Sequence, residues 1–153
     1  MTDVDPVFVF TELVRYETEL WNAIDARLRR DCDLALAEFE FLRVISRRRS
    51  CRVQDIAEDL AITVGGTSKI VDRLEAAGHC ARAVNPADKR SSLITLTRSG
   101  KGAFLRASEV FDAELHRRLR APVSGRALQQ LSRTLVALRA AGREIDAPVH
   151  SPS

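Results

Sequence analysis

The stretch VQDIAEDLAITVGGTSKIVDRLEAAGHCARAVNPADKRSSLITLT, residues 53–97, decides the fold of this 153-residue chain. It begins with apolar side chains at positions i, i+3, i+4 and i+7, namely Val53, Ile56, Ala57 and Leu60. Because this spacing puts all four side chains on one face, it predicts a short amphipathic helix. A joint at Ala61 and Ile62 follows, and Thr63 then offers a hydroxyl that can cap a second helix.

The second predicted helix is TVGGTSKIVDRLEAAG, which Gly78 stops. Its buried stripe is predicted to consist of Ile70, Val71, Leu74 and Ala77. The opposite face is predicted to carry Thr67, Ser68, Lys69 and Asp72. Gly65 and Gly66 each weaken the first turn by roughly 1 kcal/mol relative to alanine. Small residues at this place let the helix backbone approach another surface closely.

After Gly78 the pattern changes from a helical repeat to two short strands. They are predicted around residues 79–84 and in SSLITLT, residues 91–97, with a turn at NPADKR between them. The tip of this turn carries Asp88, Lys89 and Arg90. Helix, turn, helix and basic hairpin are together the layout of a winged helix-turn-helix. In that layout one helix enters the major groove of DNA and the hairpin reaches a neighbouring minor groove.

The positive charge of the chain is concentrated in the same region. Residues 43–101 contain twelve Lys or Arg and six Asp or Glu, a net charge of +6. The rest of the chain contains twelve and fifteen, a net charge of −3. Ordinary soluble surfaces can carry such an excess, but its coincidence with the helix-turn-helix pattern favours a DNA-binding surface.

Three strings of this region resemble the multiple-antibiotic-resistance-repressor (MarR) family of bacterial transcription regulators: IVDRLEAAG, NPADKRSSLITLT and RSGK. The resemblance is strongest over residues 34–104. It implies a mainly α, triangular homodimer with six helices and a two-stranded β wing per subunit, paired through the terminal helices. It also implies binding to a pseudo-palindromic operator, usually as a repressor, relieved by a phenolic or other amphipathic ligand. Gly65 and Gly66 depart from the family pattern, which more often has serine, threonine or alanine there.

Long helices are predicted on both sides of the winged segment, within a single domain over residues 1–153 whose winged lobe covers residues 34–100. Residues 34–48 have the broad apolar face of a central helix, and Thr97 can cap a further helix to about residue 119. We predict dimerisation helices at residues 6–30 and 103–142, because a reader of two half-sites needs a partner. Their seams are Val7, Val14, Trp21 and Leu28, and Leu128, Leu131, Leu135 and Leu138. The alternative for the leucines is packing within one subunit.

Arg90 is the first candidate for DNA contact, because Asp88 stands two residues earlier and its carboxylate can hold the guanidinium in position. The alternative is a solvated charge pair in a turn. Arg73 is instead predicted to form an architectural ion pair. The complete set of predicted DNA-binding residues is Arg52, Thr63, Gly65, Gly66, Thr67, Ser68, Lys69, Asp88, Lys89 and Arg90.

Two further kinds of site are considered. A ligand cleft between the dimer helices and the winged lobe is predicted to be lined by Arg15, Trp21, Glu40 and Phe41, although aromatic residues at helical spacing are often simply core. The three cysteines, Cys32, Cys51 and Cys80, lack CxxC spacing, which argues against a zinc site or a disulfide framework. They are inert small hydrophobes or, as an alternative regulatory mechanism, one of them senses oxidation.

The sequence contains no HExxH, GxSxG, P-loop or GxGxxG motif, and its three histidines are scattered. We therefore expect neither enzymatic activity nor a cofactor or metal. Neither a charged-then-apolar leader nor an apolar run near eighteen residues occurs, so we expect a cytoplasmic protein without membrane contact. The function that these patterns favour is sequence-specific regulation of transcription. The rival hypothesis is a winged-helix module that binds protein rather than DNA.

Overall fold

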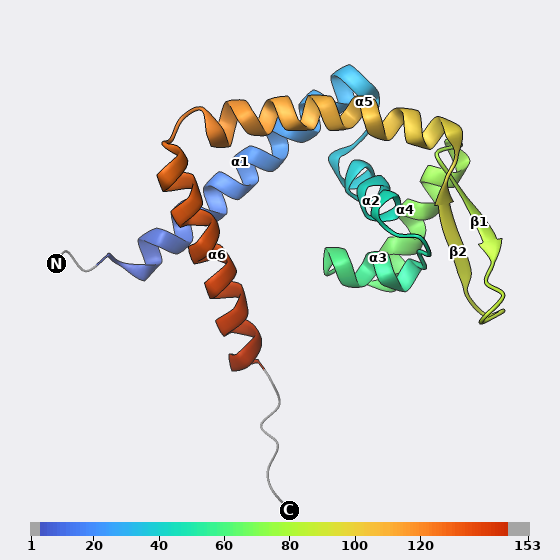
Figure 1. Ribbon diagram of the computed structural model, residues 1–153. Helices are drawn as coiled ribbons and strands as arrows, with labels where there is room; N and C mark the ends of the chain where they lie inside the picture. The colour runs from blue at the N-terminus through green and yellow to red at the C-terminus, as the bar shows by residue number, and fades with distance from the viewer. Residues whose placement is uncertain (1–3, 147–153) are drawn as a thin grey trace, which may run out of the picture. The chain divides into compact units, whose positions relative to one another are not determined.

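The computed structural model describes residues 4–146, which Figure 1 draws in colour. They form six α-helices, a π-helical turn and a two-stranded sheet. The chain divides into two compact units, Met1–Glu114 and Leu115–Ser153. The predicted domain over residues 1–153 also takes in residues 1–3 and 147–153, which lie outside the described part.

The first unit contains the predicted winged helix-turn-helix, and the predicted fold class, mainly α with a two-stranded wing, is confirmed. The last residue of α5 already belongs to the second unit. The elements in chain order are α1 (Pro6–Cys32), α2 (Leu36–Arg47), α3 (Val53–Leu60), α4 (Val64–Ala76), β1 (Cys80–Val84), β2 (Ser92–Leu96) and α5 (Arg98–Leu115).

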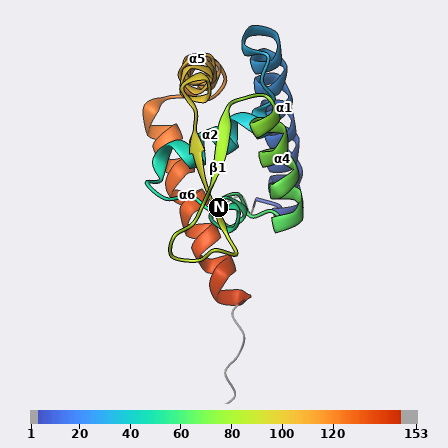
Figure 2. The ribbon, with the colours of Figure 1, turned by 90° about the vertical axis from the view of Figure 1, so that its right-hand side faces the viewer.

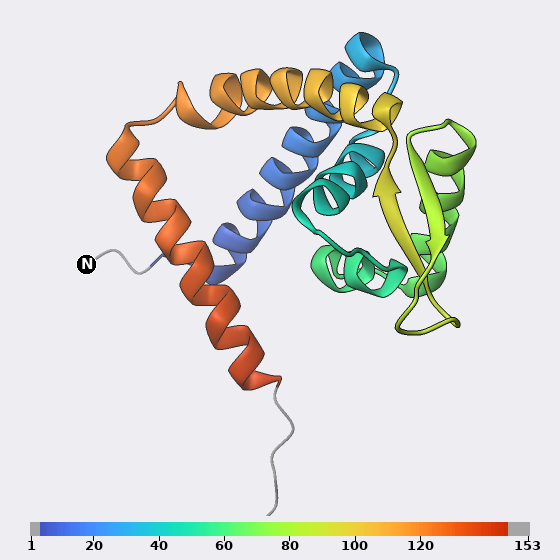
Figure 3. The ribbon, with the colours of Figure 1, turned by 45° about the vertical axis from the view of Figure 1, so that its right-hand side comes forward.

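Helix α2 is the centre of the first unit, as its broad apolar face predicts. It contacts α1, α3, α4 and β2, and Figure 3 shows it between α1 and the hairpin. Phe39 and Phe41 are each 1% exposed and Leu42 is fully buried. On α5, the ring centroids of Phe111 and Phe104 lie 4.8 and 5.8 Å from that of Phe39. Since burying one such side chain contributes about 1.5–3 kcal/mol, α2 holds the surrounding elements together.

Helices α3 and α4 lie where the sequence predicts them. The chain turns after α3 at Ala61, whose backbone is left-handed with a φ of 54°. Thr63 caps α4, because its Oγ1 accepts a hydrogen bond from the Gly66 amide at 3.1 Å. Gly78, with a φ of 77°, takes the left-handed conformation that ends the helical segment.

The buried stripe of α4 differs from the predicted one at three positions. Val71 and Leu74 are buried as predicted, but Ile70 is only half-buried and Ala77 is exposed. Thr67, predicted on the exposed face, is fully buried. It precedes Val71 and Leu74 by four and seven residues, which puts it on their face of the helix. Burial is tolerated because its hydroxyl donates to the Thr63 carbonyl at 2.8 Å.

The hairpin forms the predicted wing. Strands β1 and β2 pair antiparallel with Arg82 opposite Ile94, and Figure 2 views the protein from the side of this hairpin. The Ile94 amide donates to the Cys51 carbonyl at 2.7 Å, so the segment before α3 also adjoins the sheet. Asn85 Nδ2 donates to Ser91 Oγ at 2.9 Å and closes the base of the turn.

A tight junction joins α4, the hairpin and α5. Thr97 Oγ1 donates to the Gly78 carbonyl at 2.5 Å and accepts from the Gly100 amide at 3.0 Å, which confirms the predicted cap of α5. The Thr97 amide donates to the His79 carbonyl at 3.1 Å. A Cβ atom at Gly100 would lie 1.8 Å from the His79 carbonyl oxygen. The start of α5 can therefore pack here only with glycine at this position.

As far as residue 146, the second unit contains one π-helical turn and one complete α-helix. The turn, His116–Arg120, follows α5 directly, so the helix predicted to about residue 119 is α-helical only to Leu115. Ser124 then caps α6 (Gly125–Ile145) as predicted, since its side chain accepts a hydrogen bond from the Ala127 amide at 3.2 Å.

The residues of the two predicted dimer seams differ in exposure. On α1, Val7, Val14 and Trp21 are exposed, whereas Leu28 is fully buried. The prediction that Leu28 belongs to a dimer seam is therefore wrong, because α1 packs against α2 within the subunit. On α6, Leu131 and Leu138 are exposed, whereas Leu128 and Leu135 are half-buried.

We predict that Gly100→Ala destabilises the protein by at least about 2 kcal/mol, because the clash is with backbone and cannot be relieved by a rotamer change. Urea unfolding followed by circular dichroism measures the change. The matched control is Gly102→Ala on the same helix, where the nearest atom to a Cβ is the flexible Arg106 Nη1 at 3.4 Å. The control should be neutral or stabilising by up to about 1 kcal/mol. Equal stability of the two variants would contradict the junction.

Candidate nucleic-acid interface

The start of α4 presents a small-residue surface. Gly65, Gly66 and Lys69 are exposed, and Ser68 is half-buried. A Cβ at Gly65 would have no atom within 4 Å, so packing does not require glycine there. At Gly66 a Cβ would lie 3.1 Å from the Thr63 hydroxyl oxygen, which is the capping atom. The neighbouring atoms therefore give a structural reason for glycine at position 66 but none at position 65.

The wing tip differs from the predicted arrangement in one contact. Asp88 Oδ1 accepts a hydrogen bond from the Arg90 backbone amide at 3.0 Å, not from its guanidinium. The prediction that Asp88 holds the guanidinium is therefore wrong, because the carboxylate shapes the turn instead. Arg90 and Lys89 are exposed. Within residues 4–146, neither cation has a carboxylate partner, so both are available to an external anion.

A recess of about 340 Å³ lies between the start of α3, α4 and the wing. It brings together four of the predicted DNA-binding residues: Arg52, Ser68, Asp88 and Arg90. Others of the predicted set are not part of its lining: Thr63, Gly65, Gly66, Thr67, Lys69 and Lys89. Two helix segments and the hairpin thus converge on one basic, polar surface.

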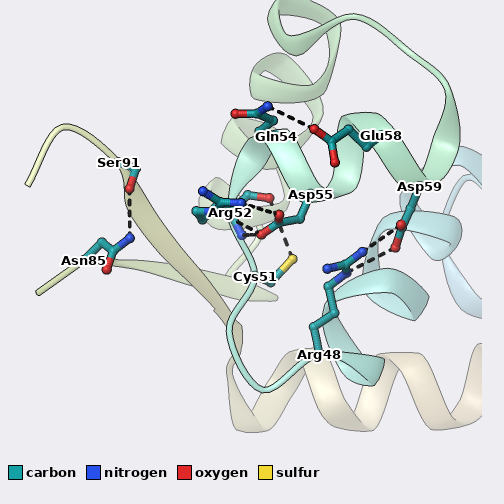
Figure 4. Close-up of polar contacts among 9 residues, drawn as sticks. All are labelled: Arg48, Cys51, Arg52, Gln54, Asp55, Glu58, Asp59, Asn85 and Ser91. Atoms are coloured by element: carbon teal, nitrogen blue, oxygen red, sulfur yellow. Dashed lines mark hydrogen bonds and ion pairs between the residues drawn. The ribbon is translucent and has the colours of Figure 1, made fainter. Parts of the chain in front are cut away.

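Asp55 holds the side chain of Arg52 at the N-terminus of α3, as Figure 4 shows. Its Nε and Nη2 donate to the two carboxylate oxygens at 3.1 and 2.8 Å, and its amide donates to Oδ2 at 2.7 Å. The hydrogen bond from the Arg52 side chain holds the pKa of Asp55 below its usual value. The ion pair with Asp55 thus fixes the orientation of the Arg52 guanidinium, and its other N–H groups remain able to donate to an external acceptor.

Arg82 is the residue that sequence reasoning missed. It stands on β1, and its Nη2 donates to Asp72 Oδ1 at 2.6 Å while Nη1 donates to Glu75 Oε1 at 3.0 Å. Asp72 and Glu75 both lie on α4, three residues apart. Arg73, predicted as the architectural ion-pair former, has no ion pair within the described residues, so that prediction is wrong. The acidic pair one helical turn apart, followed by an arginine in the next strand, was the available signal.

Of the pockets described for residues 4–146, none is lined by more than one of the four predicted ligand-cleft residues. Phe41 is buried in the core and therefore cannot line an open cleft, which makes that prediction wrong. Glu40 pairs with Arg43 next to it on α2. Arg15 pairs with Glu12 at 3.6 Å, and the exposed Trp21 lines a shallow recess together with Glu17, Thr18 and Asn22 of its own helix.

A larger pocket, which sequence reasoning did not find, lies beside the end of α2. It measures about 450 Å³ and is bounded by α2, β2 and the start of α5. Its walls are mostly apolar, with cations at Arg48 and Lys101. Arg48 is already paired with Asp59, since its Nη2 and Nε lie 2.7 and 3.1 Å from the carboxylate oxygens (Figure 4). The apolar residues that line this pocket are Ile45, Ile94, Leu96, Phe104 and Leu105.

The cysteines lie in surroundings that disfavour thiolates. Cys51 and Cys80 are buried and Cys32 is half-buried. Burial raises the pKa of Cys51 to about 11, and it also raises the pKa of Cys80 and of Cys32. Because the thiolate is the reactive form, this geometry lends no support to the thiol-sensor alternative.

Within residues 4–146, no group of three or more His, Cys, Asp or Glu side chains is placed to hold a metal ion. None of the helices in that part of the chain combines the length and the apolar character that crossing a membrane requires.

Comparison with known proteins gives a family for the winged segment. The model of the MarR family matches residues 34–92. An uncharacterized HTH-type transcriptional regulator of Bacillus subtilis, YwhA, is 37% identical over 62 residues, which are 40% of this chain and 45% of YwhA. The match thus spans less than half the length of that relative.

Solved structures share the fold over nearly the whole chain. AbsC, a MarR family transcriptional regulator from Streptomyces coelicolor, superposes with a TM-score of 0.84 and 17% identity, covering 94% of this chain and 99% of AbsC. Sco3205, a MarR family regulator from the same organism solved in complex with DNA, has a TM-score of 0.84 and 21% identity, covering 99% and 98%. The MarR family model thus matches the winged segment of this chain, residues 34–92, and the solved structures share its fold.

Proposed function

We propose that this protein is a DNA-binding regulator of transcription that acts as a homodimer on a pseudo-palindromic operator, usually as a repressor. Its MarR-family relatives are transcriptional regulators rather than enzymes, and Sco3205 was solved with DNA. We place its action in the cytoplasm, where the proposed duplex partner is found. In this proposal α4 enters the major groove and the wing reaches the adjacent minor groove.

The observation that carries the proposal is the basic recess at which α3, α4 and the wing converge. Arg90 lines this recess, and its guanidinium has no carboxylate partner within the described residues, while Arg52 is oriented by Asp55. Thr63, Gly65, Gly66, Ser68 and Lys69 extend this surface along the start of α4. In DNA the phosphates lie on both sides of a groove and the base edges lie at its floor. Cations beside a helix face of small residues can therefore bind the phosphates while that face approaches the base edges.

The homodimer is supported by the apolar side chains that each unit leaves uncovered. Val7, Val14 and Trp21 on α1 are exposed, as are Leu131 and Leu138 on α6. Exposed apolar side chains that gather into larger patches mark protein–protein interaction sites. We propose that a second copy covers both sets, with Leu128 and Leu135 contributing at the edge of the α6 seam.

Relief by a small amphipathic ligand is the regulatory part of the proposal. The pocket beside α2 has a volume within the range of small-molecule sites. Its walls include β2, a strand of the wing, so an occupant there would bear directly on the proposed DNA-binding surface.

Selection of bound duplexes from random DNA tests the function. The chain should enrich a pseudo-palindromic sequence, and its log affinity should fall with log salt by about 0.9 for each phosphate contacted. Fluorescence anisotropy on the selected duplex at several salt concentrations measures this slope. Enrichment of no sequence, or a flat slope, would sink the proposal and favour the rival protein-interaction module.

We predict that Gly65→Ala makes the protein more stable but a poorer DNA binder. Alanine should stabilise α4 by up to about 1 kcal/mol, because its Cβ meets nothing within 4 Å. The same methyl group should stand between the helix backbone and the base edges, weakening operator binding by about 1–3 kcal/mol. Gly102→Ala, on α5, serves as the control without a binding effect. Unchanged affinity of Gly65→Ala would remove close backbone approach from the account.

We predict that Leu131→Asp combined with Leu135→Asp yields monomers that keep a folded winged unit but lose operator binding. Burying the new carboxylates in a subunit interface costs several kcal/mol. Light scattering gives the mass, and far-UV circular dichroism reports the fold. A monomeric wild-type chain at micromolar concentration, or a variant that stays dimeric, would refute the proposed assembly.

A further inference from the structure

Arg82 ties the wing to α4 through three hydrogen bonds. Its guanidinium bridges Asp72 and Glu75, at 2.6 and 3.0 Å. Its backbone amide donates to the second oxygen of Glu75 at 2.9 Å. One strand residue therefore engages two carboxylates that lie about one turn apart on the helix.

The contact of the Arg82 amide also provides a hydrogen-bond acceptor for a backbone N–H group at the edge of the sheet. The wing has two strands, so β1 has an unpaired edge, and a free N–H on that edge would otherwise need water or another chain. Glu75 accepts this hydrogen bond and the side-chain one together. The carboxylate thus fixes both the backbone and the side chain of Arg82.

We infer that Arg82 is a positioning residue, which holds the wing against α4 so that Arg90 and the start of α4 meet DNA in a fixed register. This inference rests on the proposed function. Arg82 lines the same recess as Ser68 and Arg90, but its guanidinium is already committed to two carboxylates. Arg90 has no such commitment within the described residues. The division of labour is that Arg82 sets the geometry and Arg90 makes the contact.

The test compares Arg82→Met and Arg82→Lys, each with Arg90 intact and with Arg90→Ala. Methionine keeps an apolar stem of similar length but cannot bridge the carboxylates, whereas lysine can pair with only one of them at a time. Arg48→Met is the matched control, because it breaks the equally well-formed Arg48–Asp59 pair, which joins the end of α2 to α3 and not to the wing. Dissociation constants are measured on the selected operator across a salt series.

Arg82→Met should weaken operator binding by about 5- to 50-fold, and Arg82→Lys should recover part of the loss. Because the Arg82 guanidinium itself contacts no phosphate, the salt slope should not fall further than it does in Arg90→Ala alone. In the Arg90→Ala background the effect should largely vanish, since the contact that Arg82 positions is already gone. Arg48→Met should show no such dependence on Arg90.

Three results would overturn the inference: unchanged affinity, a salt slope lower in the Arg82→Met, Arg90→Ala double variant than in Arg90→Ala alone, or effects of Arg82 and Arg90 that simply add. The first denies any role, and the others indicate direct phosphate contact. Amide hydrogen exchange of residues 80–96 in the DNA-free protein gives an independent readout, because the Met variant should exchange faster there. If the wild-type chain binds no duplex, the proposed function fails. Amide exchange of residues 80–96 that is the same in Arg82→Met as in the wild type would still contradict the positioning role of Arg82.

Discussion

The hydrogen bonds of Thr97 are the constraint on which the arrangement of the winged unit depends. Its hydroxyl joins the end of α4, at Gly78, to the start of α5, at Gly100. Its amide meets the carbonyl of His79, just before β1. Thr97 thus joins α4, α5 and β1, and the missing side chain at Gly100 makes the close approach possible. Movement of α4 relative to the hairpin must disturb this junction or the Arg82 contacts, because they join the same two elements at different places.

Cations of the winged region fall into two groups by their partners. Arg48, Arg52 and Arg82 each pair with carboxylates on a neighbouring element or at a helix start. They lock the positions of α3, α4 and the wing. Lys69 and Arg90 have no carboxylate partner within the described residues and are exposed. The count of twelve Lys and Arg in residues 43–101 therefore overstates the cations free for DNA, but the paired ones determine where the free ones stand.

Local signals predicted the elements well because capping and helical repeats depend on neighbouring residues only. The Thr63 cap, the Gly78 stop and the stripe from Val53 to Leu60 are of this kind. Thr67 misled the prediction because a threonine hydroxyl can be satisfied by its own helix, so that a polar side chain enters the core.

The remaining misses concern partners distant in sequence. Leu28 fits a helical seam, but a helix with two apolar sides gives no indication of which one its own subunit covers. The Arg82 pairing depends on how the hairpin lies against α4, and no periodicity encodes that. The ligand-cleft residues failed for the same reason, since Phe41 and Trp21 face different surroundings although both are aromatic on predicted helices.

The central claim is that α4 and the wing read adjacent grooves of one duplex as a single rigid surface. Dimethyl sulfate footprinting of the selected operator tests it most directly, since it methylates guanine N7 in the major groove and adenine N3 in the minor groove. The account predicts protection of guanine N7 in each half-site and of adenine N3 about half a helical turn away, with half-site centres roughly 34 Å apart. Protection of guanine N7 without any protected adenine N3 in the flanking minor groove would contradict it.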